Sequence, residues 1–351
     1  MAVLKLNQIK QHNLAAALRQ FCSCSALSRR ELAARMQCDH ATATRVVKKL
    51  LDDRLLCFSG KVETAHGRPR EMLSLHPDSP VTLGLELGLD GVSGVILDLQ
   101  GNLIGECFQS EKDCKSYPQA LKMCVSELTE KLDRPLGASA LAAIGTLDPE
   151  RAVITECANC PQLNGWDLET FWQENLPLPM PFFTDRMIAL MHRLTRQCRN
   201  WQSGLGMLVD TSNGIGMALA HDGEIINLQR RHGGEFGHNT VIPGGKRCRC
   251  GRRGCLEAYM SNFDDPESAG ELFGLMLANQ INNLLVSYCT VSGKLVEDTE
   301  FVCAVRRTVM QQLLGLAKAE LELEFHPDSG SAASGAALLA KEQYLSCFAG
   351  I

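Results

Sequence analysis

Hydrophobic residues recur at helical spacing in the first part of the chain. Leu14, Leu18 and Phe21 lie three or four residues apart, which predicts a first amphipathic helix. Residues 28–31 have the sequence SRRE, a capping box in which the first and last side chains bond each other's backbone N–H. This box predicts the start of a second helix, which we expect to continue to about Met36.

A third helix is predicted after Asp39, which can cap it. Its buried stripe consists of Ala43, Val46, Val47, Leu50 and Leu51. Its opposite face is polar and basic and consists of His40, Thr42, Thr44, Arg45, Lys48 and Lys49. Two helices joined by a three- or four-residue turn, with the second helix basic on its outer face, are typical of a helix-turn-helix.

Two short strands are predicted at residues 55–59 and 70–75, and the segment between them would form a wing. The third helix can enter a major groove, where threonine hydroxyls and Arg45 reach bases or phosphates. In the wing, Arg68 can enter a narrow minor groove beside Arg70. The alternative is that these charges are only the solvated surface of a small helical domain.

From residue 81 the pattern changes to dense apolar runs interrupted by glycine. It predicts two strands joined by a turn and a third strand after residues 100–102. A similar run begins at Gly204, so two hairpin-led α/β units, with a ligand cleft between them, are expected. Apolar residues at helical spacing predict later helices over 272–288, 303–323 and 335–344.

Composition narrows the class of protein. The chain has 351 residues, enough for two or three domains. It has 16 cysteines, but 13 of them lack the spacing of a disulfide framework, which argues against a secreted, stapled fold. No apolar run has the length of a membrane span, and no signal segment is evident at the start. We therefore expect a protein of the reducing cytoplasm.

The net charge of −5 conceals an uneven distribution. Residues 1–75 contain 13 Lys or Arg against 6 Asp or Glu, whereas residues 76–351 contain 22 against 34. Only the first segment therefore has the positive charge that nucleic acid attracts. We expect a DNA-binding domain at 1–75 and a separate body at 76–351.

The segment at residues 233–257 has the spacing of a metal site. GGEFGH at 233–238 is followed, after nine residues, by CRCGRRGCLE at 248–257. One imidazole and three thiols, from His238, Cys248, Cys250 and Cys255, are the ligand number and type of a closed structural zinc site. Such a site leaves no position open for a reactive water. The alternative is a set of ordinary buried thiols.

With these motifs, in this order, the chain resembles the ROK family of repressors and sugar kinases, and within it the winged-helix repressors. The resemblance covers nearly the whole chain, and residues 235–238 with 248–257 are its most specific part. It implies an N-terminal winged helix-turn-helix followed by an α/β actin-like ATPase fold with two RNase-H-like lobes. It also implies a homodimer or homotetramer.

The resemblance further implies a sugar site. The roles that family members give to an amide, three carboxylates and a histidine fall here on Asn159, Asp185, Glu235, His238 and Glu257. Carboxylates and amides suit a sugar because each can bond paired hydroxyls. His238 would serve twice, with one ring nitrogen on zinc and the other toward the sugar. Asp185 can instead be only a capping residue at the end of a strand.

Kinases of this family need two phosphate loops and a catalytic Asp. Here the first loop, residues 86–92, lacks the paired glycines and the Thr hydroxyl, while the second, 210–216, keeps Gly214 and Gly216. Asp185 occupies the position of the base, and we expect the adjacent Arg186 to depress its pKa. We therefore predict no kinase activity and treat Asp185 as a vestigial base.

Three hypotheses follow. The first is a repressor that binds double-stranded operator DNA and responds to a sugar or sugar phosphate, with zinc as a structural cofactor. The second is a hexose kinase with an appended DNA-binding head. The third is a zinc-stabilised scaffold that a sugar-transport protein of the membrane sequesters.

Overall fold

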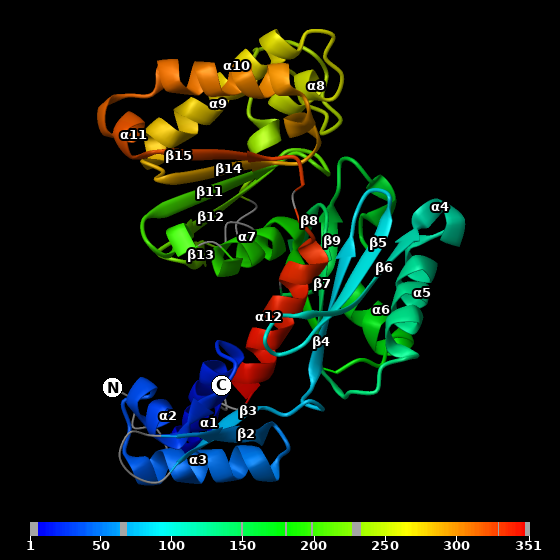
Figure 1. Cartoon of the computed structure of the whole chain (residues 1–351). Coiled ribbons are helices and arrows are strands. Elements are labelled where there is room, and N and C mark those ends of the chain that lie inside the picture. Colours follow the sequence, from blue (N-terminus) through cyan, green and yellow to red (C-terminus); the bar gives the residue numbers. More distant parts are fainter. Residues whose placement is uncertain are drawn as a thin grey trace.

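A computed structural model shows three parts, an N-terminal module and two lobes, joined by a long C-terminal helix (Figure 1). The structure describes residues 6–63, 69–148, 150–179, 181–197, 199–226, 233–328 and 330–347.

The N-terminal module contains three helices and a small sheet. The helices are α1 (Leu6–Cys22), α2 (Arg29–Arg35) and α3 (His40–Asp52). The strands β1 (Leu27–Ser28), β2 (Leu56–Val62) and β3 (Arg70–Leu75) form a sheet of order β1-β3-β2. The predicted capping box at Ser28 and the cap at Asp39 are both present. Strand β2 continues three residues beyond the predicted end, into the expected wing.

Lobe I is built on a five-stranded sheet of order β10-β7-β4-β5-β6. Its strands are β4 (Val81–Leu87), β5 (Gly91–Leu97), β6 (Leu103–Ser110), β7 (Leu136–Ala143) and β10 (Pro181–Asp185). Its other elements are α4 (Glu111–Cys114), α5 (Tyr117–Thr129), α6 (Leu168–Asn175), the 3-10 turn η1 (Pro161–Leu163) and the hairpin of β8 (Thr146–Asp148) and β9 (Val153–Glu156).

Lobe II repeats this plan with a sheet of order β13-β12-β11-β14-β15. Its strands are β11 (Leu205–Asp210), β12 (Gly216–His221), β13 (Glu224–Ile226), β14 (Tyr288–Ser292) and β15 (Glu322–His326). Its helices are α8 (Leu256–Met260), α9 (Pro266–Leu284), α10 (Thr299–Gln312) and α11 (Gly315–Glu320), with 3-10 turns η2 (Arg199–Gln202), η4 (Phe236–His238) and η5 (Lys294–Glu297). In each lobe, three antiparallel strands are followed by two strands that add in parallel.

Two of the predicted helices were wrong at their ends. Helix α9 stops at Leu284, where Leu285 takes a left-handed conformation, and Tyr288 begins β14. The predicted helix over 303–323 is broken after α10, and Leu323 lies in β15. Periodicity failed at β14 because a short apolar run in a buried strand has the same pattern as a buried helical segment. At β15 the polar and apolar residues alternate, which was an available strand signal.

Helices α7 (Arg186–Gln197) and α12 (Ala332–Cys347) pack side by side between the two sheets. Small side chains line this seam: Ala138, Ala140 and Ala142 of β7, Ala189 of α7, Ala218 and Ala220 of β12, and Ala332, Ala336 and Ala340 of α12. Gly84 of β4 is needed because a methyl group there would strike the Ala333 carbonyl and Ala337. The lobes therefore approach each other through alanine and glycine.

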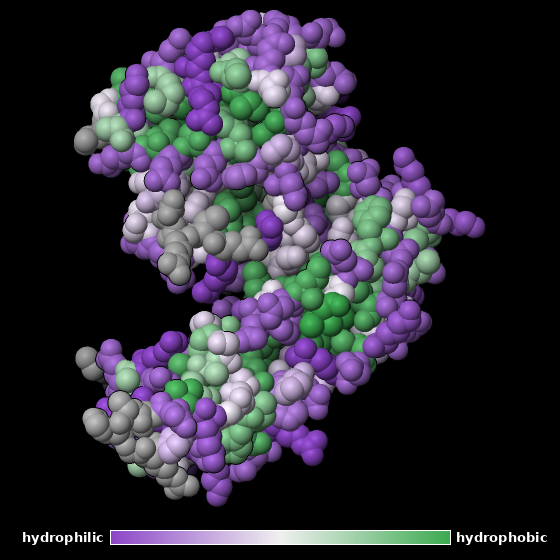
Figure 2. Space-filling model, in the orientation of Figure 1, coloured by the Kyte–Doolittle hydropathy of each residue, from purple (hydrophilic) through white to green (hydrophobic). Residues whose placement is uncertain are grey.

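The far end of α12 belongs to the N-terminal module. Leu345 is buried in the same core as Leu18, Phe21 and Leu50. Arg19 of α1 donates to Ser346 Oγ at 3.3 Å and pairs with Glu342 at 3.6 Å. Figure 2 shows a hollow on this face between the module and the lobes, and α12 crosses that region in the same view of Figure 1.

Two further properties bear on the expected class of protein. The fifteen cysteines in the described part of the chain are free thiols. Within the described ranges, no helix combines the length and the apolar character that crossing a membrane requires.

Leu345→Ala is expected to destabilise the protein by about 2–5 kcal/mol, because it opens a cavity where α12 enters the core of the module. Urea unfolding followed by far-UV circular dichroism measures the change. Leu103→Ala is the matched control, since Leu103 is 53% exposed and Leu345 only 1%; its effect should stay within about 0.5 kcal/mol. Equal losses for the two variants would contradict the packing of α12 into the module.

Candidate functional site

A cleft of about 500 Å³ lies between the lobes. Lobe I lines it with residues that follow β7, β9 and β10, and lobe II lines it with the 210–216 turn and the 233–257 loop. The five residues predicted for a sugar site all line this one cleft: Asn159, Asp185, Glu235, His238 and Glu257. They come together from segments that lie almost a hundred residues apart in the chain.

Asn159 and Glu257 connect the two walls of the cleft. The Asn159 Nδ2 amide donates to Glu257 Oε1 at 3.2 Å, and the Ile215 N–H donates to Glu257 Oε2 at 3.1 Å. Glu257 is buried at the first turn of α8. Gly214 has a φ of 102°, and a side chain there would press on Asn159 Nδ2. This close approach explains why the second loop keeps its glycine.

Asp185 ends β10 and precedes α7. Its Oδ1 accepts the Met187 N–H at 2.6 Å, so it also has the capping contact that was considered as the alternative role. Desolvation raises the pKa of Asp185 to about 7; the Met187 hydrogen bond opposes the rise and the charge of Glu235 adds to it. The charge of Arg186 lowers this pKa, as expected, but desolvation outweighs it, so the pKa of Asp185 is raised rather than depressed.

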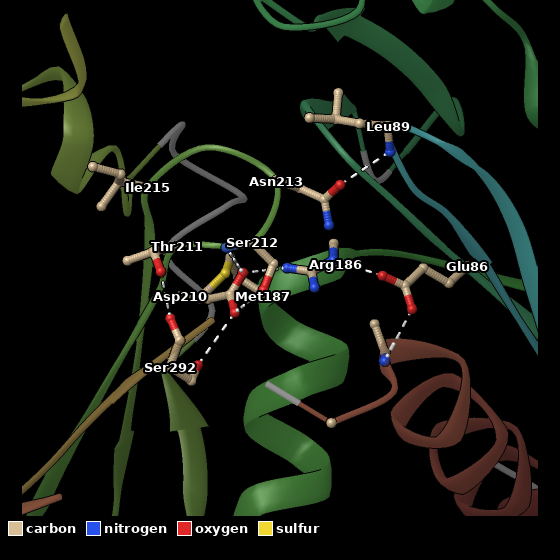
Figure 3. A network of polar contacts seen from close by, with 12 residues as sticks. Glu86, Leu89, Arg186, Met187, Asp210, Thr211, Ser212, Asn213, Ile215 and Ser292 are labelled. Atoms are coloured by element: carbon tan, nitrogen blue, oxygen red, sulfur yellow. Dashed lines mark hydrogen bonds and ion pairs between the residues drawn. The ribbon is translucent and has the colours of Figure 1, made fainter. Parts of the chain in front are cut away.

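Arg186 bonds two other carboxylates, which explains why its effect on Asp185 is small. Its Nε donates to Glu86 Oε1 at 2.6 Å and its Nη1 donates to Asp210 Oδ2 at 2.5 Å. Figure 3 shows the guanidinium between these two carboxylates. Neither contact was predicted, because nothing in the local sequence pairs residues 100 and 24 positions apart.

Glu235 and His238 lie at the mouth of the cleft. Glu235 Oε2 is 4.0 Å from His238 Nε2, and the carboxylate side chain is 54% exposed. Partial desolvation raises the pKa of Glu235, His238 opposes the rise, and Glu257 adds to it. The other ring nitrogen, Nδ1, faces Cys248. The two nitrogens of His238 thus point to different surroundings, as the double role requires.

The predicted metal ligands converge. One donor atom from each of His238, Cys248, Cys250 and Cys255 lies within 4.8 Å of the others, so the cluster can hold a metal ion. In a tetrahedral zinc site the bond lengths place two sulfurs about 3.8 Å apart and a sulfur and a nitrogen about 3.6 Å apart. The Cys250–Cys255 sulfurs are 3.7 Å apart, and Cys248 Sγ is 3.6 Å from His238 Nδ1.

The loop that presents these ligands also reaches the cleft. The backbone forms isolated antiparallel β-bridges between Thr240 and Cys255 and between Arg247 and Arg253, and these fold the loop back on itself. Arg249 donates to Asn159 Oδ1 at 3.3 Å, and Arg252 donates to the His238 carbonyl at 3.0 Å. The sequence reasoning missed both arginines, although they lie inside the ligand motif.

The polar face of α3 is where the sequence placed it. His40, Thr44, Arg45, Lys48 and Lys49 are exposed and Thr42 is partly buried. The Thr42 hydroxyl donates to Asp39 at 2.9 Å and accepts from Arg45 at 3.1 Å. Lys49 is instead paired with Asp53 at 2.6 Å.

The structure adds a second basic surface between α2 and the wing. Arg29, Arg30, Lys61 and Arg70 border a hollow of about 360 Å³. Arg29 is held by Glu71 at 2.8 Å. Arg29 and Arg30 lie in the SRRE capping box, where Arg30 is exposed and Arg29 is partly buried. Arg68, predicted to be in the wing, falls outside the described residues.

A family model described as "ROK family" matches residues 82–263, which is more than half of the chain. The chain belongs to the ROK family. The matched region spans the first hairpin of lobe I, the cleft and the metal-ligand loop.

Two curated relatives and one solved structure indicate the branch. The chain is 24% identical over 265 residues to the xylose repressor of Bacillus spizizenii, covering 72% of this chain and 66% of that protein. It is 25% identical over 289 residues to the DNA-binding transcriptional repressor Mlc of Escherichia coli strain K12, covering 80% and 69%. The alignment thus spans slightly less than two thirds of the xylose repressor.

A solved ROK family transcriptional regulator, described as a homologue of the E. coli Mlc protein, has the same fold. It superposes with a TM-score of 0.74 at 18% identity and covers 98% of both chains. This match confirms the predicted actin-like fold with two α/β lobes, and it extends over the N-terminal module as well.

Asp185→Asn is expected to raise the melting temperature at about pH 8 and to have a shrinking effect as the pH falls toward about 4. The wild-type acid has a folded-state pKa above its unfolded value, so its stabilising contribution is present at low pH and is lost as the pH rises through about 7. Asparagine keeps the acceptor for Met187. Differential scanning fluorimetry across this pH range measures the effect.

Asp167→Asn is the opposite control. Asp167 caps α6, and its hydrogen bonds from Thr170 lower its pKa. Its contribution is therefore present above the unfolded pKa and is lost on acidification, so the variant should melt earlier near neutral pH. A lower melting temperature for Asp185→Asn at pH 8 would contradict the prediction, because it would show that ionising the buried Asp185 carboxyl costs little folding free energy.

Proposed function

We propose that this protein is a sequence-specific DNA-binding transcriptional regulator, and most simply a repressor, whose interlobe cleft takes a sugar or sugar phosphate. One observation carries the proposal: α12 joins a module with capped helices and a basic outer face to a ROK-family body. The names of the aligned repressors support it.

For the DNA-binding surface, we propose that α3 enters the major groove with Thr42, Thr44 and Arg45 toward the bases. His40 and Lys48 are placed to contact phosphates, as is Arg70 at the base of the wing. Lys49 would do so after leaving its partner Asp53. Arg29, Arg30 and Lys61 extend this surface. In this proposal two modules, paired by the bodies in a homodimer or homotetramer, bind a palindromic operator.

For the effector, we propose that Asn159, Asp185, Glu235, His238 and Glu257 bind hydroxyl groups. The side chains of Asn159, Asp185 and Glu257 are already held by backbone and side-chain contacts, so the ordering cost of binding is reduced. A ligand that bonds both walls prefers one arrangement of the lobes, and α12 connects the lobes to the module. Such a preference is what a change in operator affinity requires.

For the metal, we propose structural zinc. The donor set is soft, and its separations match tetrahedral zinc–sulfur and zinc–nitrogen geometry. The ion would brace residues 233–257, and with them Glu235, His238 and Glu257 on the wall of the cleft. All four positions are taken by protein, so this role is structural rather than catalytic.

The kinase hypothesis is not favoured. A kinase must hold metal-bound phosphates between its two loops, whereas here Arg186 lies between Glu86 and Asp210 and neutralises carboxylates at those positions. Leu89 and Val92 also stand where the first loop of a kinase needs small or hydroxyl side chains. We therefore propose a regulatory body without phosphoryl transfer.

Arg45→Ala should weaken binding to the operator by a factor of about 5 to 150, corresponding to the loss of about 1–3 kcal/mol for a base-contacting arginine. The probe is DNA from directly upstream of the protein's own gene, measured by fluorescence anisotropy at physiological salt. A sugar or sugar phosphate that raises the melting temperature in a ligand screen should release this DNA from the wild type.

Arg307→Ala serves as the control, because Arg307 is an exposed arginine in lobe II that pairs with Glu267 and Glu271. It should leave operator affinity unchanged. Wild-type protein that binds the upstream DNA no more tightly than shuffled DNA of equal length would refute the proposed function.

Purified protein should contain about one zinc ion per chain, and Cys248→Ser should lower that content and the melting temperature. Mass spectrometric metal analysis and scanning fluorimetry measure the two effects. Cys303→Ser, at an exposed thiol outside the cluster, should change neither. A Cys248→Ser protein with full zinc content and unchanged stability would contradict the metal site.

A further inference from the structure

The strongest feature outside the proposed sugar and metal sites is the Arg186 bridge, which consists of Glu86, Arg186 and Asp210. The three side chains come from the end of β4 in lobe I, the first turn of α7 and the end of β11 in lobe II. Their side-chain exposures are 11%, 7% and 2%. The bridge is therefore a buried ionic contact that spans the two lobes (Figure 3).

Each carboxylate of the bridge has further partners. Glu86 Oε2 accepts the backbone N–H of Ala332, the first residue of α12, at 3.1 Å. Asp210 Oδ1 accepts the hydroxyls of Ser212 at 3.1 Å and Ser292 at 3.2 Å. The bridge thus joins one turn of each lobe to both helices of the central seam.

A second contact ties the same two turns together. The Leu89 N–H, in the turn after β4, donates to Asn213 Oδ1, in the turn after β11, at 3.0 Å. Both segments occupy the positions of the two phosphate loops in the kinases of the family. Here protein groups make the contacts between them.

The electrostatics make the cation indispensable to this arrangement. Burial alone would lower the pKa of Arg186, but the charges of Asp210 and Glu86 outweigh it and raise the pKa, so the guanidinium stays charged. Without it, two carboxylates would face each other in a desolvated site, and breaking one partner of a buried pair is strongly destabilising. The planar guanidinium can serve two carboxylates at once.

We propose that Arg186 is an internal bridge that holds the lobes in the present arrangement without any ligand, and that the cleft opens only when Arg186 leaves one of its two carboxylates. Because Glu86 also holds the first N–H of α12, release of the bridge loosens the start of the helix that enters the N-terminal module. Asp185, in the proposed sugar site, is the neighbouring residue in the chain.

This inference deepens the proposed function by naming the element that a ligand in the cleft would act on. Its structural part, the holding of the two lobes, needs neither sugar nor DNA. It can therefore be tested on the full-length protein alone.

The test is hydrogen–deuterium exchange followed by mass spectrometry on the wild type and on Arg186→Met, which keeps a long side chain without the charge. Exchange should accelerate by on the order of tenfold in three separate segments, residues 86–91, 210–216 and 332–335, because all three lose their common anchor.

Arg307→Met is the matched control. Arg307 also lies between two carboxylates, Glu267 and Glu271, each at 2.8 Å, but all three residues are at the surface of lobe II. Its exchange changes should stay within α9 and α10. Acceleration confined to α7 in Arg186→Met, or unchanged exchange throughout, would overturn the inference.

A second variant covers the case in which Arg186→Met does not fold. The triple variant Arg186→Met/Glu86→Gln/Asp210→Asn leaves no unpaired buried charge and should fold. The same three segments should exchange faster in it, and protection equal to the wild type would again refute the bridge. Failure of operator binding would refute the proposed function and leave this exchange result intact, so the two failures are distinguishable.

Discussion

The fold depends on a charge that cannot be left unpaired. A guanidinium buried between the lobes is tolerated only with its carboxylates in place. The free-energy cost of desolvating a lone ion is larger than the stabilisation that most other contacts provide. Arg186 therefore requires β4 and β11 to end, and α7 to begin, at one point. The alanine and glycine seam of α7 and α12 meets this requirement sterically, since larger side chains would keep the sheets too far apart for the ion pairs to form.

The same requirement explains why the inner and outer parts of the cleft are held by different contacts. The lobes are joined deep inside by charge, whereas the outer wall is a loop with little regular structure of its own. Glu257 is held through Ile215 and Asn159, and the four-ligand cluster closes the loop behind it. Contacts of this kind position polar groups before a ligand arrives, which in the proposed function favours recognition of hydroxyl groups by geometry.

Local sequence signals predicted much of this structure, and the features that could not be predicted depend on non-local contacts. Capping by Ser28 and Asp39 and the apolar stripe on α3 predict their helices, because capping and periodicity are patterns that extend over only a few residues. The convergence of the four candidate metal ligands could be predicted because three of them lie in one short motif. The direction of Arg186 and the entry of Leu345 into the N-terminal core depend on partners far away in the chain, so no local pattern encodes them. Strand β14 was missed because a short buried strand lacks alternation. Strand β15 does alternate, so its signal was present but was not used.

Asp185 and Arg186 show why adjacency in sequence is a poor guide to electrostatics. At the junction of a strand and a helix, successive side chains diverge, so the guanidinium turns to Glu86 and Asp210 while the carboxyl faces the cleft. The charge of Arg186 is balanced mainly by two closer carboxylates. Desolvation is then the largest effect on the pKa of Asp185, which rises to about 7. A carboxyl poised near neutrality can donate to a hydroxyl oxygen as well as accept from a hydroxyl. The bridge therefore shapes the cleft twice, by holding its walls and by leaving Asp185 with only a small compensating effect of Arg186.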